Sequence, residues 1–160
     1  MSDKISEQDF FNALKDAILP DDEVIVMYAG IWSFAHNFGG EVRKIPDMML
    51  DIIEDVVGKE RTLLFAGFCA NHFVKHGEFD LTRTPPSESG ILAKYALKRK
   101  GYVRTYQPLH SFLVRGPRAQ EVLDLPCTSS WGEDSVLAWM GGVNARILSL
   151  GLPLHLACSY

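Results

Sequence analysis

Residues 104–119, RTYQPLHSFLVRGPRA, contain the side chain best suited to proton transfer, the imidazole of His110. Pro108 restricts the backbone before it, and the run from Ser111 to Arg115 predicts a strand, so the ring would be held on a rigid edge. Rigid placement is what a general base requires. The same residues also fit a half-buried histidine whose ring bonds a neighbouring carbonyl, and taken alone they favour that interpretation.

Two other stretches have the chemistry to bind an anion. Residues 82–90, TRTPPSESG, combine Arg83 with hydroxyl groups and a predicted helix start at Ser87, where free backbone N–H groups attract negative charge. A simple helix cap explains Ser87 equally well. Arg115 and Arg118 flank a Gly-Pro turn before another predicted helix and could hold phosphates, although two arginines on a turn are more often only solvated.

Several familiar motifs are absent or weak. Gly39 and Gly40 lack the spacing of a dinucleotide-binding loop, and no P-loop or nucleophile-elbow pattern occurs. His72 and His76 are four residues apart and could share a metal on a helix, but NHFVKHGEF has poor helical signals and predicts a surface loop. Cys69 shows no sign of activation and is expected to be a buried thiol. We therefore predict no metal site.

An α/β framework must position these residues. Ser6 and Asp9 resemble a capping pair before apolar residues at helical spacing, and Pro46 suits the first turn of a helix that ends at Gly58. Residues 61–68, RTLLFAGF, form an unbroken apolar run that is typical of a central strand covered on both faces. Further strands are predicted at residues 24–28, 111–115 and 145–151, and further helices at 87–97, 117–123 and 134–140.

This order of elements predicts an α/β fold, a mixed β-sheet flanked by helices, in a single domain over residues 1–160. The sequence ends in ILSLGLPLHLACSY without a polar tail or closing helix, whereas complete domains usually end on solvated residues. We therefore expect the fold to be incomplete at the C-terminus, after Tyr160. We also expect an unfinished apolar edge through which the chain could associate with itself.

Composition narrows the functional classes. The net charge of −4 argues against nucleic-acid binding, and the one dense basic run, Lys94 to Lys100, fits the solvated face of a helix. Three cysteines without CxxC spacing fit thiols in a reducing compartment. No apolar run approaches the roughly 20 residues of a membrane span, and the N-terminus has no signal core. These features predict a cytoplasmic protein without a membrane partner.

Taken in order, several segments resemble the aminoglycoside 3-N-acetyltransferase family, acetyl-CoA-dependent enzymes whose fold differs from that of GNAT acetyltransferases. The most specific segment contains His110 and resembles the family's H-P-x-H-S element, in which the second histidine is implicated as general base. The other segments are ISEQDFFNALKDA, DDEVIVMY, the pair Gly39 and Gly40, DIIEDVVGKERTLLF, FDLTRTPPSESGILAK, WGEDSVL and ARILSLG.

The resemblance implies direct acetyl transfer from acetyl-CoA, the co-substrate, to an amine of an aminoglycoside, with His110 as general base and no metal. A neutral imidazole would remove a proton as the amine nitrogen attacks the thioester. The residues that the resemblance assigns to acetyl-CoA are Ser33, Arg83, Ser87, Ser89, Gly90, Ser111, Arg115 and Arg118.

The sequence departs from the family pattern at named positions. Ala29 and Gly30 replace a Ser-Ser pair that lines the acetyl-CoA site, with Ser33 nearby as a substitute. Gln107 replaces the first histidine of the H-P-x-H-S element, and Pro85 replaces a threonine. The family also continues well beyond this length, into a histidine and a glutamate needed for the site. The carboxylate that would orient His110 is therefore expected beyond the sequence given.

Two alternatives remain open at this point. The acceptor could instead be an amino sugar of surface polysaccharide synthesis, which QPLHSF and the lost Ser-Ser pair would suit. The chain could also be a truncated, non-catalytic homologue that still binds CoA. Both alternatives keep the same fold but change the substrate or remove the reaction.

Overall fold

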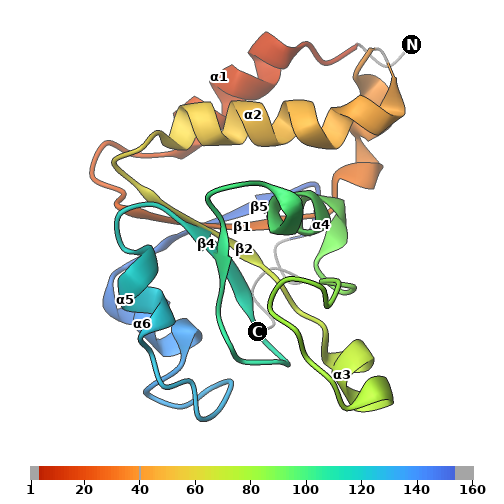
Figure 1. The fold of residues 1–160 in the computed structure, drawn as a ribbon. Coiled ribbons are helices and arrows are strands. Elements are labelled where there is room, and N and C mark those ends of the chain that lie inside the picture. The colour runs from red at the N-terminus through yellow and green to blue at the C-terminus, as the bar shows by residue number, and fades with distance from the viewer. Residues whose placement is uncertain (1–3, 40, 154–160) are drawn as a thin grey trace.

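The computed structural model describes residues 4–39 and 41–153, which form a five-stranded sheet between two groups of helices (Figure 1). The strand order is β3-β4-β2-β1-β5. β1 is parallel to β2 and β5, whereas β4 is antiparallel to β2 and β3. The predicted mixed sheet is therefore confirmed. The strands are β1 (Val24–Ala29), β2 (Thr62–Ala66), β3 (Val103–Arg104), β4 (Phe112–Arg115) and β5 (Arg146–Leu150).

The strand register defines two edges of the sheet. Ala66, the last residue of β2, pairs with Phe112, the first residue of β4, and Leu63 pairs with Arg115. The carboxyl ends of β1 and β2 therefore lie beside the start of β4, and we call this the carboxyl edge. The opposite edge, where β1 and β2 begin and β4 ends at Arg115, is called the amino edge.

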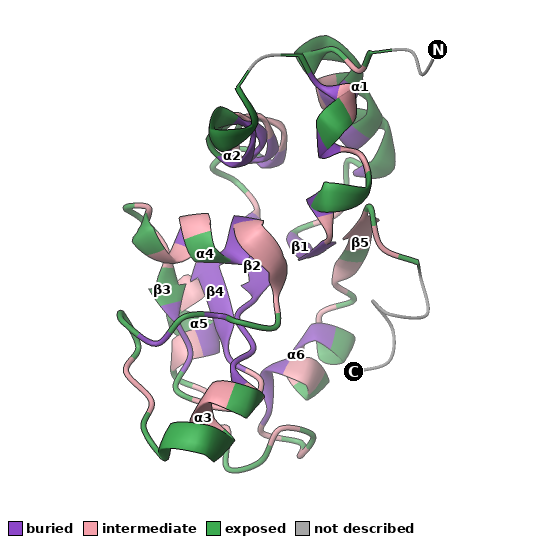
Figure 2. Ribbon diagram, turned by 90° about the vertical axis from the view of Figure 1, so that its right-hand side faces the viewer, coloured by how far each residue is buried: buried purple, intermediate pink, exposed green. Residues whose placement is uncertain are grey.

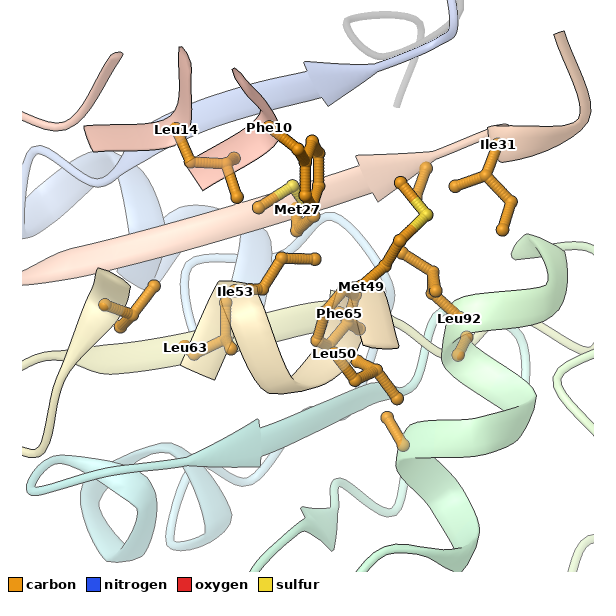
Figure 3. Packing of buried hydrophobic residues seen from close by; sticks show 14 of the residues in the cluster. Phe10, Leu14, Met27, Ile31, Met49, Leu50, Ile53, Leu63, Phe65 and Leu92 are labelled. Atoms are coloured by element: carbon orange, nitrogen blue, oxygen red, sulfur yellow. The ribbon is translucent and has the colours of Figure 1, made fainter. Parts of the chain in front are cut away.

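One face of the sheet is covered by α1 (Glu7–Ala17), α2 (Ile45–Val57) and α4 (Gly90–Lys98). The predicted capping box is present at Ser6 and Asp9, Pro46 lies in the first turn of α2, and α2 ends at Gly58. Figure 3 shows the core that these helices form with the strands. Its labelled residues are Phe10, Leu14, Met27, Ile31, Met49, Leu50, Ile53, Leu63, Phe65 and Leu92.

The other face is covered by two short helices, α5 (Ala119–Leu123) and α6 (Val136–Gly142). Val122, Val136 and Met140 pack there against the alternate strand residues, including Leu64 and Phe112. All five residues of β2 are buried, and Figure 2 shows β2 and β4 as buried strands between helices. Because successive side chains point to opposite faces, two covered faces explain the unbroken apolar run, as predicted.

One predicted loop and the predicted start of α4 are wrong. Residues predicted as a surface loop form α3 (Ala70–His76), which ends where Gly77 takes the left-handed conformation, with φ 68°. No residue of α3 is buried, so the helix has no apolar face that the sequence could reveal. α4 begins at Gly90 with Ser89 at its N-cap, because the backbone at Ser87 is held in a turn by Pro85.

The remaining differences are local. α5 begins at Ala119 rather than at Pro117, and α6 begins at Val136 after the cap Ser135. β3 was not predicted, because two residues carry no periodic signal. Between β1 and α2 the chain forms three short 3-10 turns, η1 (Ile31–Ser33), η2 (Ala35–Asn37) and η3 (Val42–Lys44). No helix in the described ranges is long and apolar enough to cross a bilayer.

Candidate active site

A pocket of about 310 Å³ opens at the carboxyl edge, where β1 and β2 end and α4 begins. Ligands of open α/β sheets bind at this end of the strands, where loops diverge and helix N-termini present free N–H groups. The lining residues come from both parallel strands, from the loop before α4 and from the segment after β5. They are Tyr28, Ala29, Gly30, Ala66, Phe68, Glu88, Ser89, Gly90 and Leu152.

The start of α4 lies so close to β1 that it requires glycine. Gly90 has φ 79°, and a Cβ atom built there would lie 2.5 Å from the carbonyl oxygen of Ala29. Any side chain at this position would push the helix away from the strand and deform the pocket wall. Gly90 therefore positions the backbone of the pocket.

Phe68 forms part of the pocket wall and bonds the loop before α4. Its backbone N–H donates to the Ser89 hydroxyl at 2.6 Å, and its carbonyl accepts from the Glu88 N–H at 3.2 Å. The Glu88 carboxylate in turn accepts from the Asn71 N–H at 2.7 Å. Ser89 thus bonds strand-end backbone rather than capping α4, and the loop is held against the end of β2.

His110 lies in the tight connection between β3 and β4. The side-chain oxygen of Gln107 accepts from the backbone N–H groups of Leu109 and His110, both at 2.7 Å. The imidazole packs edge-on against Phe68, with ring centroids 4.9 Å apart, and against Trp131, at 5.4 Å. Phe68 therefore touches both the pocket and the imidazole, which brings His110 to the pocket's outer wall.

The environment of His110 favours the neutral imidazole. Partial burial lowers the pKa of His110 below its ordinary value, and the negative charge of Glu88 opposes this shift without cancelling it. A neutral ring near pH 7 has a nitrogen lone pair that can accept a proton. The group is thus in the protonation state that a general base needs.

The segment from Cys127 to Ser135 covers the other side of His110. Asp134 stabilises this segment, because its carboxylate accepts from both the N–H and the hydroxyl of Thr128, at 3.0 and 2.7 Å. Cys127 has φ 47°, a left-handed conformation that costs free energy in a non-glycine residue. The narrow gap beside the ring has no room for a water molecule and is lined by Gln107, His110, Phe112, Cys127, Ser129, Ser130, Ser135, Val136 and Leu137.

Two further predicted residues lie at the carboxyl edge. The Ser111 hydroxyl is fully buried and donates to the Gly67 carbonyl at 2.6 Å. The Ser33 hydroxyl donates to the carbonyls of Gly30 and Gly151, at 3.2 and 3.0 Å, and so ties two segments at the pocket rim. Both hydroxyls fix backbone rather than line the pocket.

The predicted arginines do not gather at the pocket. Arg115 and Arg118 lie at the amino edge, where Arg115 contacts Glu54 and Arg118 pairs with Glu121 at 2.7 Å. Arg83 lies on the loop before α4, with an exposed guanidinium 2.8 Å from Asp80. Each guanidinium has a carboxylate partner, and only Arg83 is in a segment that also reaches the pocket.

Cys69, His72 and His76, the other residues weighed for chemistry, lie outside the lining of the pocket. Cys69 is buried, donates to the Pro108 carbonyl at 2.9 Å, and has a pKa raised by burial, so the expected buried thiol is confirmed. His72 and His76 are neighbours on α3, with ring centroids 4.5 Å apart. In residues 4–39 and 41–153 no third potential ligand joins them. Gly40 and Cys158 lie outside the described residues.

Three residues at the site escaped the sequence interpretation: Glu88, Arg104 and Trp131. Glu88 acts on His110 only because the loop before α4 packs against the end of β2. Arg104 is buried, 5 % exposed, in a strand too short to predict. An arginine between two β-branched residues in VRT was the available signal for Arg104, and no sequence signal pointed to Glu88 or Trp131.

Comparison with known proteins shows the family and the fold of the chain. The family model described as aminoglycoside 3-N-acetyltransferase matches residues 33–159. The curated aminoglycoside N(3)-acetyltransferase VIII of Streptomyces fradiae is 28 % identical, over 82 % of this chain and 51 % of the relative. The chain thus spans about half the length of that relative.

Solved structures of acetyltransferases share the fold. Aminoglycoside acetyltransferase AAC(3)-IIb superimposes with a TM-score of 0.77 at 19 % identity, over 98 % of this chain and 62 % of that protein. AAC-IIIb in a binary complex with CoASH gives a TM-score of 0.75 at 23 % identity, over 94 % and 60 %. Because the family model covers most of the sequence, we conclude that the chain belongs to the aminoglycoside 3-N-acetyltransferase family.

Proposed function

We propose that this protein is an acetyl-CoA-dependent N-acetyltransferase that acetylates an amine of an aminoglycoside, with His110 as general base. The observation that carries the proposal is the position of Phe68, which lines the pocket and packs against the His110 ring at 4.9 Å. Family membership supports the reaction class. The structures of AAC-VIa with sisomicin and of AAC-IIIb with CoASH support the two kinds of substrate.

The proposed reaction needs one proton acceptor. The amine nitrogen attacks the thioester carbonyl and a C–N bond forms, while the neutral imidazole of His110 takes the proton from that nitrogen. The tetrahedral intermediate then collapses, the C–S bond breaks, and the proton passes from the imidazolium to the departing CoA sulfur. No acetyl-enzyme forms, so the acetyl group moves directly between the substrates.

The pocket suits the acetyl-pantetheine end of the co-substrate. Its walls are largely apolar, from Tyr28, Phe68 and Leu152, while the backbone at Gly90 offers N–H groups for a carbonyl. Arg83 is an exposed cation on the same loop and is proposed as a contact for the CoA phosphates, together with the Ser87 hydroxyl. Arg115 and Arg118 are excluded from this proposal because they lie at the amino edge.

We place the reaction in the cytoplasm, in a single domain over residues 1–160 and without a nucleic-acid or membrane partner. The free thiols of Cys69 and Cys127 support a reducing compartment. The net charge of −4 is compatible with a cationic acceptor. Within the described residues β5 is the outermost strand on its side of the sheet, and Ile147 is 43 % exposed there. This supports self-association through the free side of β5.

Thiol release from acetyl-CoA tests the proposal. The protein is assayed with a panel of aminoglycosides and with amino-sugar nucleotides, and the acetylated product is identified by mass spectrometry. Turnover with aminoglycosides supports the proposal. Turnover with amino sugars alone would show that the acceptor is an amino sugar and not an aminoglycoside. Binding of acetyl-CoA by calorimetry without turnover of any amine would overturn the enzymatic proposal in favour of a CoA-binding homologue.

A further inference from the structure

The geometry points to Arg104 as a positioning residue of the site, one that holds the His110 segment and the loop before α4 in fixed relation to the end of β2. This inference rests on the proposed function for its catalytic meaning, but its physical content can be measured without turnover. Arg104 touches neither the pocket nor the His110 ring, so it would act through the residues that it bonds.

The Arg104 guanidinium joins three segments of the carboxyl edge. Nε donates to the Ser111 hydroxyl at 3.0 Å, and Nη1 donates to the Thr84 carbonyl at 2.5 Å. Nη2 donates to the Gly67 carbonyl at 2.6 Å. These acceptors belong to the residue before β4, the loop before α4 and the residue that follows β2. One planar group therefore sets the distances among three chain segments that are remote in sequence.

Electrostatics distinguish the buried Arg104 from the partly buried Arg99, Arg115 and Arg146. Within residues 4–39 and 41–153 it forms no ion pair, whereas Arg99, Arg115 and Arg146 each pair with a carboxylate. Its charge is met instead by neutral oxygens and by the ring of Phe79, 4.8 Å from the guanidinium carbon. A buried cation without a counter-ion is costly, so stability alone gives a poor reason for an arginine here.

The bonds of Arg104 lead directly to the catalytic candidate. Ser111 follows His110, and its hydroxyl accepts from Arg104 while donating to the Gly67 carbonyl at 2.6 Å. The backbone adds a bond from the Gly67 N–H to the Ser111 carbonyl at 2.8 Å. Gly67 precedes Phe68, the wall against which the imidazole packs. Arg104 thus fixes both partners of the contact between Phe68 and His110.

The other arm of the guanidinium fixes the loop that supplies Glu88 and Ser89. Thr84, whose carbonyl accepts from Arg104, is followed by two prolines that stiffen the chain as far as Ser87. Ser89 then accepts from the Phe68 N–H. Loss of Arg104 is expected to loosen this loop and the His110 segment together, and to admit water to the imidazole.

Two substitutions and a small-molecule rescue test this role. Arg104→Lys keeps the charge but loses the three-way fork, and Arg104→Ala leaves a space that methylguanidinium can fill. The primary readout is the pKa of His110, from the NMR titration of its ring protons, beside the thermal midpoint. Arg99→Lys is the matched control, because Arg99 is also partly buried and pairs with Asp51 and Glu54.

We expect the pKa of His110 to rise toward its ordinary value of about 6.5 in both Arg104 variants and to stay unchanged in Arg99→Lys. Methylguanidinium should restore the low value in Arg104→Ala. If the wild-type protein is active, kcat should fall about 10- to 100-fold with little change in KM for acetyl-CoA.

Three outcomes would overturn the positioning role. The first is a folded Arg104→Lys with the wild-type pKa of His110. The second is a kcat loss matched by Arg99→Lys. The third is unfolding of both Arg104 variants that methylguanidinium does not reverse, because Arg104 would then serve folding in general. An inactive wild-type protein would count against the proposed function alone, since the pKa and its rescue are measured without substrate.

Discussion

The two edges of the sheet treat charge in opposite ways. At the amino edge Arg61 bonds backbone carbonyls, but the other arginines meet carboxylates. Arg146 forms a two-pronged pair with Asp22, and Arg115 and Arg99 share Glu54. At the carboxyl edge Arg104 is buried among neutral oxygens, and His110 is kept neutral beside the pocket. The ion pairs of the amino edge stabilise the fold, whereas the carboxyl edge carries the pocket of the proposed site.

Glycines with positive φ occur at both edges and so do not follow this division. Gly90 at the carboxyl edge and Gly116 at the amino edge both have positive φ, 79° and 118°, and both touch the backbone of a parallel strand. A glycine that must have positive φ therefore does not by itself mark the edge with the proposed site. The distinguishing feature is the buried Arg104, whose oxygen partners in the described residues are neutral.

The largest expected effect is on catalysis at the carboxyl edge. His110→Ala should lower kcat/KM for acetyl transfer by about 10²- to 10⁴-fold, the usual contribution of a general base. The thermal midpoint should change little, because the ring is only partly buried. His76→Ala, on the exposed face of α3, is the control and should retain wild-type turnover. Equal activity of the two variants would remove His110 from the mechanism.

At the amino edge the largest effect should be on stability. Glu54→Gln leaves the guanidinium groups of Arg99 and Arg115 without their shared carboxylate and should lower the free energy of unfolding by about 1–3 kcal/mol. Urea unfolding measures the loss. The pKa of His110 and the affinity for acetyl-CoA should stay at wild-type values. A change in either would show that the two edges are coupled.

The two glycines with positive φ separate stability from binding. Gly90→Ala and Gly116→Ala should each cost about 1–3 kcal/mol of stability, because alanine must adopt a positive φ beside strand backbone. Only Gly90→Ala should also weaken acetyl-CoA binding, since Gly90 lines the pocket. Calorimetric titration below the unfolding temperature makes the comparison, and equal affinities in the two variants would contradict it.

The smallest effects should appear in the pH dependence of stability. The folded pKa of His110 lies below its unfolded value, so protons bind the unfolded chain preferentially. The stability that neutral His110 contributes is complete above pH about 6.5 and is lost as the pH falls through the folded pKa.

For Asp22 the hydrogen bond from Arg146 lowers the folded pKa, so its contribution persists until the pH falls below about 4. Urea unfolding of His110→Gln should therefore show a flatter pH profile near pH 6, and Asp22→Asn a flatter profile only near pH 3. Identical profiles in the two variants would contradict the assignment of these pH windows to the two edges.

The central helices and strands could be predicted because buried faces place apolar residues at regular spacing in the sequence. The apolar run of β2, the capping pair of α1, and Pro46 with Gly58 around α2 each have a local physical cause. α3 has no buried residue, so its sequence shows no apolar spacing that would predict a helix. The start of α4 was misplaced because Ser87 and Ser89 are both good caps in a short polar stretch.

The candidate site was predictable only where a motif was local. His110 was found from its own segment, as part of a resemblance. Glu88 and Arg104 could not be found in this way, because each acts through a contact between distant segments. Glu88 and His110 are more than 20 residues apart in the sequence, and Arg104 and Gly67 are 37 residues apart. Arg115 and Arg118 were assigned to the site because they are close to His110 in the sequence. In the structure the length of β4 separates them from His110, so they are at the opposite edge.

Mapping of acetyl-CoA by backbone NMR tests the central division most directly. Titration of labelled protein should shift the amide signals of Gly30, Ala66, Ser89 and Gly90, which line the pocket. Signals of Arg115, Arg118 and Arg146 at the amino edge should not move. Shifts confined to the amino edge, or no shifts at saturating acetyl-CoA, would contradict the assignment of the carboxyl edge as the acyl-transfer site.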